Sequence, residues 1–184
     1  TVEDPIEMIE PAFNQTQVQP ALDLDFAASV RALMRQDPDI IMVGEIRDLE
    51  TAEMAVQAAL TGHLVFSTLH TNDSASAVTR LLDLGVPSYL ISATLIGVLA
   101  QRLVRTLCPA CRQPDEAMTP DALAAAMPGL PVARLVQGAE RDGERHFRPM
   151  RAAGCQACRM TGYRGRSGLF ELLTFDEGVR HAIS

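Results

Sequence analysis

Two pairs of cysteines form the clearest chemical pattern in this sequence. Each pair has two residues between its members, in Cys108-Pro-Ala-Cys111 and in Cys155-Gln-Ala-Cys158. This spacing lets two thiolates face one tetrahedral ion, and four thiolates close a structural Zn²⁺ site that has no open position. Two disulfides are the alternative. We expect zinc, because the rest of the sequence is typical of a cytosolic protein, in which thiols stay reduced.

An apolar run at 40–43 is followed by Gly44 and by the acid Glu45. Ligands of parallel sheets sit outside the carboxyl ends of the strands. An acid at such a place can hold Mg²⁺ through water or align an attacking water. The same pattern also fits a buried strand followed by an ordinary surface acid. Residues 39–45 alone do not separate the two interpretations.

A second acidic segment opens the chain, with Glu3, Asp4 and Glu7 close together. Pro5 biases Asp4 toward an extended conformation and ends any strand at that point. Next to a strand end, these acids are suited to metal or general-base chemistry. A solvent-exposed acidic turn is the alternative, and the segment by itself favours it because acids are seldom buried.

Two histidines bracket the short apolar strand that we expect at 63–68. His63 and His70 fall at opposite ends of that strand, which argues against their sharing a metal ion. His70 stands among Thr, Asn and Asp residues, where it is placed to sense a phosphate. The alternative for each is a structural role, in which the ring has hydrogen-bond partners within the fold. This is the more common role of a single histidine.

The elements that must position these residues follow from hydrophobic spacing and from capping residues. Asp25 is a plausible cap for the first helix. The sequence predicts helices at 26–36, 49–60, 73–84, 88–100 and 120–127, and one that begins at 176. It predicts strands at 40–43, 63–68, 103–107 and 168–175. Strands that alternate with helices at this spacing predict an α/β fold with a parallel sheet flanked by helices.

Changes in amino-acid composition along the chain suggest three segments. We expect an α/β core at 1–107, a small cysteine module at 108–165, and a returning strand with the start of a helix at 166–184. The 184 residues suffice for one domain and a small satellite, and 47% of them are hydrophobic. No run is long enough to span a bilayer, and the start lacks the order of a signal peptide. We expect the sequence to begin within a domain.

The charge balance argues against nucleic acid as a partner. The formal net charge is −7, which gives no general attraction to nucleic acid or to anionic lipid. Aromatic residues are scarce and tryptophan is absent, so stacking platforms for bases are not expected. These two features weigh against a motor that moves along nucleic acid.

All 16 basic side chains are arginine, and the sequence contains no lysine. A Walker A phosphate-binding loop requires a lysine that reaches the β- and γ-phosphates of a nucleotide. This chain therefore cannot supply such a loop from its own residues.

Taken in order, four segments resemble the secretion ATPase superfamily that drives type II secretion and type IV pili. Residues 1–7 resemble its aspartate box, 38–48 its Walker B segment, 61–73 its histidine box, and 101–111, 154–158 and 161–166 its tetracysteine segment. The cysteine segment and Gly168-Leu-Phe-Glu-Leu-Leu173 look most like the type II secretion ATPase. The pilus-assembly ATPase is the close alternative.

The resemblance implies the C-terminal part of a RecA-like ATPase domain from a homohexameric motor. It implies ATP with Mg²⁺ as the ligands of the intact protein and a structural Zn²⁺ in the cysteine module. The ring would lie on the cytoplasmic face of the inner membrane, held there by an inner-membrane platform protein and a cytoplasmic docking protein. Neither catalysis nor ring formation by this chain alone is implied.

The resemblance also implies roles for individual residues. Glu3 and Glu45 would share the acidic duties around Mg²⁺ and the attacking water, and His70 would lie near the γ-phosphate. His63 would be a supporting histidine, and Arg47 would join it and Glu45 in binding the nucleotide. A rival interpretation is a non-catalytic zinc module for protein docking, which would leave the two acidic segments unexplained.

Overall fold

The computed structural model describes residues 1–128, 132, 140, 141, 144, 145 and 149–183. The chain forms two compact units. Unit 1 comprises Thr1–Gln101 and Phe170–Ser184, and unit 2 comprises Arg102–Leu169. Unit 2 encloses the residues 108–165 for which the sequence predicts a separate cysteine module. No helix within the described residues has both the length and the hydropathy needed to cross a bilayer.

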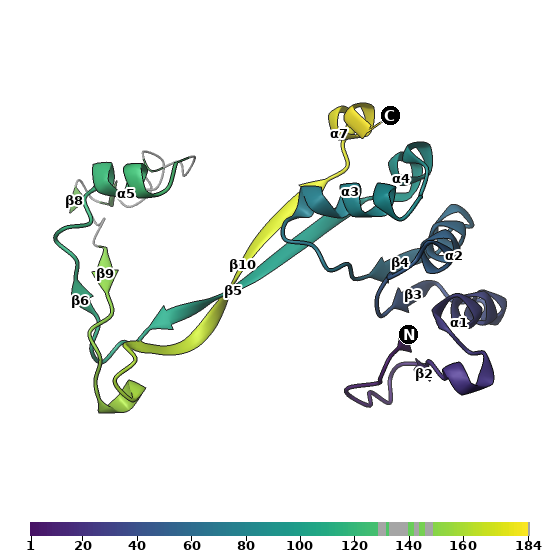
Figure 1. The fold of residues 1–184 in the computed structure, drawn as a ribbon, viewed down its shortest axis with the longest axis horizontal. Coiled ribbons are helices and arrows are strands. Elements are labelled where there is room, and N and C mark those ends of the chain that lie inside the picture. The colour runs from purple at the N-terminus through teal and green to yellow at the C-terminus, as the bar shows by residue number, and fades with distance from the viewer. Residues whose placement is uncertain (129–131, 133–139, 142–143, 146–148, 184) are drawn as a thin grey trace. The chain divides into compact units, whose positions relative to one another are not determined.

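A four-stranded sheet is the centre of unit 1 (Figure 1). Its strands are β1 (Val2–Glu3), β2 (Thr16–Gln17), β3 (Ile40–Val43) and β4 (Leu64–Ser67), in the spatial order β2-β1-β3-β4. Every neighbouring pair is parallel. The predicted α/β fold with a parallel sheet is therefore confirmed.

Aspartate side chains begin the three helices that follow strands or loops of this sheet. The helices are α1 (Phe26–Leu33), α2 (Leu49–Leu60) and α3 (Ser74–Asp83). Asp25, Asp48 and Asp73 each accept a backbone N–H from the first turn of their helix, at 2.7, 2.8 and 2.8 Å. Such caps satisfy amide groups that have no partner inside the helix. The sequence predicted these three starts to within one residue.

Two hydrophobic clusters hold unit 1 together. One joins the sheet to α1 and contains Val2, Val18, Phe26, Val30, Ile41, Val43 and Ala58. The other gathers residues of α2, α3, α4 (Ser88–Thr94) and the chain end, namely Ala52, Val78, Leu81, Val86, Ile91 and Phe175. The C-terminal helix α7 (Glu177–Ile183) packs against the second cluster through Val179 and Ile183. Short 3-10 turns lie at Pro20–Leu22 and Met34–Gln36.

The predicted helix at 88–100 is wrong in its second half. Helix α4 ends at Thr94, and β5 (Gly97–Leu107) begins three residues later. An apolar run such as 95–100 fits a helix or a buried strand by its pattern alone. Pairing with the long strand β10 (Tyr163–Thr174) decides for the strand. Both strands are also longer than the predicted 103–107 and 168–175.

Besides the ends of β5 and β10, the described part of unit 2 contains several short elements. Strand β6 (Gln113–Pro114) pairs antiparallel with β9 (Met150–Arg151), and β7 (Glu140–Arg141) pairs antiparallel with β8 (Glu144–Arg145). Helix α5 (Pro120–Ala126) agrees with the predicted 120–127, and Thr119 caps it. A 3-10 turn at Gln156–Cys158 contains Cys158, and Cys155 is the residue just before it.

Candidate functional site

The parallel register brings the carboxyl ends of three strands to one edge of the sheet. Val2 lies opposite Val43, and Val43 lies opposite Ser67. Glu3, Glu45 and His70, which stand at or just beyond these ends, therefore occupy the same edge. Their roles in catalysis stay predictions.

Gly44 allows the strands to approach closely where Glu45 leaves the sheet. Its N–H donates to the carbonyl oxygen of Val2 at 2.7 Å. A Cβ atom at this position would lie 3.0 Å from that same oxygen. A larger residue would thus push β1 and β3 apart and displace the acid that follows.

The Glu45 carboxylate lies between a cation and an imidazole. Its Oε1 is 2.5 Å from Nη2 of Arg47, and its Oε2 is 3.3 Å from Nε2 of His70. The Glu45 side chain is only 13% exposed, and Oε2 is buried without a well-formed hydrogen bond. A buried carboxylate oxygen with free acceptor capacity fits a Mg²⁺ ion or a water molecule, which are hard, oxygen-preferring partners.

Arg47 stabilises the ionised form of this carboxylate. The hydrogen bond from Arg47 is the main reason that the pKa of Glu45 lies below its ordinary value, and it outweighs the raising effect of partial burial. A charged carboxylate is the form that can bind a cation or orient a water.

Glu3 is held by two neutral donors. Its Oε1 accepts the hydroxyl of Thr1 at 2.5 Å and the side-chain amide of Gln15 at 3.1 Å. The Thr1 hydroxyl and then the Gln15 amide lower the pKa of Glu3. Glu3 is therefore also ionised at neutral pH, on the same edge as Glu45.

His63 does not join these residues. It precedes β4, at the opposite end of that strand from His70. Its Nδ1 lies 3.0 Å from the carbonyl oxygen of Ala58 and 3.1 Å from Oγ1 of Thr61. These contacts cap the end of α2, which is the structural role that the sequence left open. A role in nucleotide binding stays a prediction.

Sequence reasoning missed two contacts that shape this edge. The Thr68 hydroxyl donates to the carbonyl oxygen of Gly44 at 2.7 Å. The Glu171 carboxylate of β10 accepts hydrogen bonds from Ser74, at the start of α3. Neither has a local sequence signal, because each joins segments that are distant along the chain.

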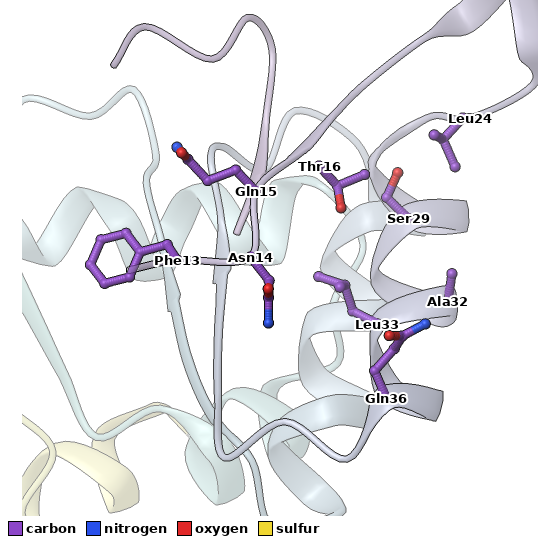
Figure 2. Close-up of a pocket in the computed structure, with 9 residues that line it drawn as sticks. All are labelled: Phe13, Asn14, Gln15, Thr16, Leu24, Ser29, Ala32, Leu33 and Gln36. Atoms are coloured by element: carbon purple, nitrogen blue, oxygen red, sulfur yellow. The ribbon is translucent and has the colours of Figure 1, made fainter. Parts of the chain in front are cut away.

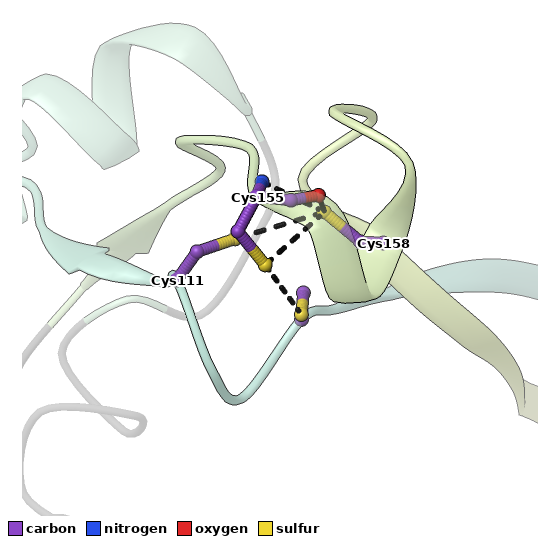
Figure 3. Close-up of side chains that lie close together, drawn as sticks. Cys111, Cys155 and Cys158 are labelled. Atoms are coloured by element: carbon purple, nitrogen blue, oxygen red, sulfur yellow. Dashed lines mark hydrogen bonds between the residues drawn. The ribbon is translucent and has the colours of Figure 1, made fainter.

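In unit 2, the four cysteine sulfurs converge on one point (Figure 3). All four Sγ atoms lie within 4.8 Å of one another, and the closest pairs are 3.8 to 4.0 Å apart. The cysteines are free thiols rather than disulfides. Sulfurs held about 2.3 Å from one tetrahedral ion lie about 3.8 Å from one another, so the cluster fits a zinc ion.

Backbone amides surround this cluster. Gly154 N–H donates to Cys111 Sγ at 3.3 Å, and Gly162 N–H donates to Cys158 Sγ at 3.2 Å. Burial raises the pKa of Cys111 to about 11, whereas in Cys158 the amides of Cys155 and Gly162 overcome burial and lower the pKa to about 6. Amide donors that stabilise thiolates support metal coordination.

Two cavities in unit 1 are lined by different kinds of side chain. The smaller, about 380 Å³, lies between the segment 13–16 and α1 (Figure 2). None of the side chains that line it is an acid, a base or a cysteine. The larger, about 800 Å³, lies between β4 and the start of β5 and is lined mainly by apolar side chains. Phe66 of β4 is 53% exposed beside it.

Comparison with known proteins gives one consistent result. The family model described as type II/IV secretion system protein matches residues 1–184. The chain is 54% identical to the type IV pilus assembly ATPase TfpB of Acinetobacter baylyi and 52% identical to type II secretion system protein E of Aeromonas hydrophila. Both matches cover 100% of this chain, but only 29% and 34% of those two proteins. The chain thus spans about a third of the length of these relatives.

Solved structures agree with this result. The pilus retraction motor PilT with bound ADP superposes on 99% of the chain and 40% of its own, with a TM-score of 0.60 at 29% sequence identity. The ATPase DotB of Legionella pneumophila superposes on 98% of the chain and 37% of its own, with a TM-score of 0.59 at 27% identity. The chain belongs to the type II/IV secretion system protein family.

Proposed function

We propose that this chain is the C-terminal part of a RecA-like motor ATPase that couples ATP hydrolysis to type II protein secretion through pseudopilus assembly. The observation that carries the proposal is the ionised Glu45 carboxylate at the sheet edge, with a buried oxygen that faces His70. Identity of 52% to a type II secretion system protein E supports the assignment. Type IV pilus assembly is the second candidate, supported by 54% identity to TfpB.

Each residue has a proposed task at the nucleotide. Glu45 and Glu3 would hold Mg²⁺ and orient the attacking water, since both are ionised and share one edge. His70 would approach the γ-phosphate, and Arg47 would stabilise the charged form of Glu45 and contribute to nucleotide binding together with His63. Mg²⁺ would neutralise the charge on the phosphates. The phosphate-binding loop must come from outside this chain, which has no lysine.

The wider assembly is also a proposal. The intact protein would form a homohexamer at the cytoplasmic face of the inner membrane, bound to a membrane platform protein and to a docking protein. The four cysteines would hold a structural zinc in every subunit. The apolar cavity between β4 and the start of β5 supports the view that further protein packs beside β4.

Phosphate release tests the proposal. The purified 184-residue chain should release no phosphate from Mg-ATP. The chain has a net charge of −7, so its acids repel ATP, and it has no phosphate-binding loop to hold the phosphates. The same chain, joined to an upstream segment that contains a phosphate-binding loop, should hydrolyse ATP. In that joined polypeptide, Glu45→Gln should retain binding of a fluorescent ATP analogue and lose roughly 100-fold to 10,000-fold in kcat.

Glu53→Gln is the matched control, because Glu53 is an exposed acid on α2 with no proposed role at the nucleotide. It should leave kcat unchanged. Hydrolysis that survives in the 184-residue chain and vanishes with Glu45→Gln would refute the need for an outside phosphate-binding loop. A joined polypeptide that binds no nucleotide would refute the ATPase assignment.

A further inference from the structure

A carboxylate on β10 holds the first residue of α3. Ser74 is 2% exposed, and its N–H donates to Oε1 of Glu171 at 3.2 Å. The Ser74 hydroxyl donates to the same oxygen. The two residues are 97 positions apart in the sequence. The first N–H groups of a helix have no acceptor within the helix. The cap residue Asp73 accepts the N–H of Ser76, and Glu171 accepts the N–H of Ser74.

The segment just before Ser74 carries His70. At its start, the Thr68 hydroxyl donates to the Gly44 carbonyl at 2.7 Å, and the Ile46 N–H donates to the Thr68 carbonyl at 3.0 Å. These bonds tie the beginning of the segment to the loop that bears Glu45. Glu171 ties its end to β10. The segment 68–73 is therefore anchored on both sides by residues that are distant in the sequence.

His70 depends on these anchors for its position. Its side chain is 90% exposed, so packing does not hold the ring, although Nε2 lies 3.3 Å from Glu45 Oε2. Inside the segment, the Thr71 N–H donates to the Leu69 carbonyl at 3.1 Å, and the Thr71 hydroxyl donates to the Asp73 carbonyl at 3.2 Å. These short-range bonds stiffen the segment, so a shift at Ser74 is transmitted to His70.

We propose that Glu171 is a positioning residue for ATP hydrolysis. It holds the start of α3, and through the segment 68–73 it fixes His70 opposite Glu45. Glu171 does not touch the nucleotide in this proposal, and it acts only through His70. The inference rests on the proposed function, in which Glu45 and His70 serve hydrolysis.

Steady-state kinetics of the joined polypeptide tests this role. Glu171→Ala should lower kcat by roughly tenfold to a hundredfold, as small misplacements of catalytic groups do, with KM for ATP changed less than about twofold. In a His70→Ala background, Glu171→Ala should cause no further loss, because the group through which it acts is gone. Losses that multiply in the double variant would overturn the proposal.

Two further variants sharpen the kinetic test. Glu171→Gln keeps an oxygen that accepts both hydrogen bonds from Ser74, so it should retain most of kcat even if the alanine variant folds poorly. Glu53→Ala removes an exposed acid from α2 and should leave kcat unchanged. A glutamine variant that is as impaired as the alanine variant would show that charge near the nucleotide, rather than positioning, is what matters.

A second readout needs no hydrolysis. In the 184-residue chain, labelled histidine rings can be followed by nuclear magnetic resonance. Glu171→Ala should shift and broaden the His70 ring signals and leave those of His63 in place, whereas Glu53→Ala should alter neither. Unchanged His70 signals would overturn the proposal. Shifted His70 signals together with an inactive joined polypeptide would uphold the positioning contact and refute the proposed function.

Discussion

The two oxygens of the Glu45 carboxylate have different surroundings. Oε1 binds Arg47, whereas Oε2 is buried and faces His70 without a well-formed hydrogen bond. Oε1 is thus paired with the guanidinium that stabilises the charged carboxylate, and Oε2 can still accept a hydrogen bond or bind a cation. A carboxylate divided in this way is suited to hold a cation or a water without becoming protonated.

Arg47→Met should raise the pKa of Glu45 toward its ordinary value, because Arg47 is the largest cause of the lowered pKa. A lowered folded-state pKa stabilises the fold above the unfolded-state pKa of about 4.5, and this contribution is lost as pH falls through the folded-state value. The variant should therefore lose less stability on acidification than the parent. A carbon-detected titration of the carboxyl group measures the pKa directly.

The control is Arg31→Met, which breaks an exposed ion pair with Glu50 at 3.6 Å. Exposed pairs contribute little to stability. The pKa of Glu45 should stay where it is in that variant. A Glu45 pKa that does not move in Arg47→Met would contradict the assignment of Arg47 as its main partner.

Strand β3 shows how one short element serves both the core and the site. Its side chains alternate between buried and exposed, since neighbours along a strand point to opposite faces. Ile41 is 1% exposed in the cluster with α1, and Ile40 is 59% exposed. Because alternate residues of β3 are buried, the register of the strand is fixed, and with it the position at which Gly44 and Glu45 leave the sheet.

Ile41→Ala should lower the free energy of unfolding of unit 1 by about 2–5 kcal/mol, because it leaves a cavity in the core. Ile40→Ala removes the same atoms from an exposed position, so it should change that free energy by less than about 0.5 kcal/mol. Urea denaturation followed by far-ultraviolet circular dichroism compares the two. Equal losses in both variants would contradict the described register of β3.

Two compact units share the chain, and each has its own source of stability. Unit 1 rests on two hydrophobic clusters around a sheet and helices. In unit 2, Cys108 and Cys158 are buried among short strands and turns, and their thiols lie in one cluster with Cys111 and Cys155. A bound metal ion can supply the folding free energy that a small module of this kind needs.

Removal of zinc should therefore loosen unit 2 and spare unit 1. After treatment with a strong chelator, amide hydrogen exchange at 102–169 should speed up by at least about tenfold, whereas exchange in β3, α2 and β4 should stay close to its original rate. Mass spectrometry of peptide fragments resolves the two units. The double variant Cys108→Ser/Cys158→Ser should show the fast pattern with or without chelator. Equal acceleration in both units would contradict separate stabilisation.

The sequence by itself determined the features that depend on neighbours along the chain. Asp25 as a cap predicted where α1 begins, and hydrophobic spacing predicted the starts of α2 and α3 to within one residue, because both signals act over a few neighbouring residues. The two cysteine pairs predicted paired thiolates for the same reason. The parallel sheet followed from strands that alternate with helices, and residues 1–184 matched one family throughout.

Only the tertiary structure decided what depends on contacts across the chain. The apolar run after Thr94 became β5 because β10 supplied hydrogen-bond partners that local pattern does not reveal. The same holds for the bond from Thr68 to Gly44 and for the bond from Ser74 to Glu171. Residues that are far apart in sequence meet only when the whole chain has paid the entropy of closing the loops between them, so no local signal encodes their meeting.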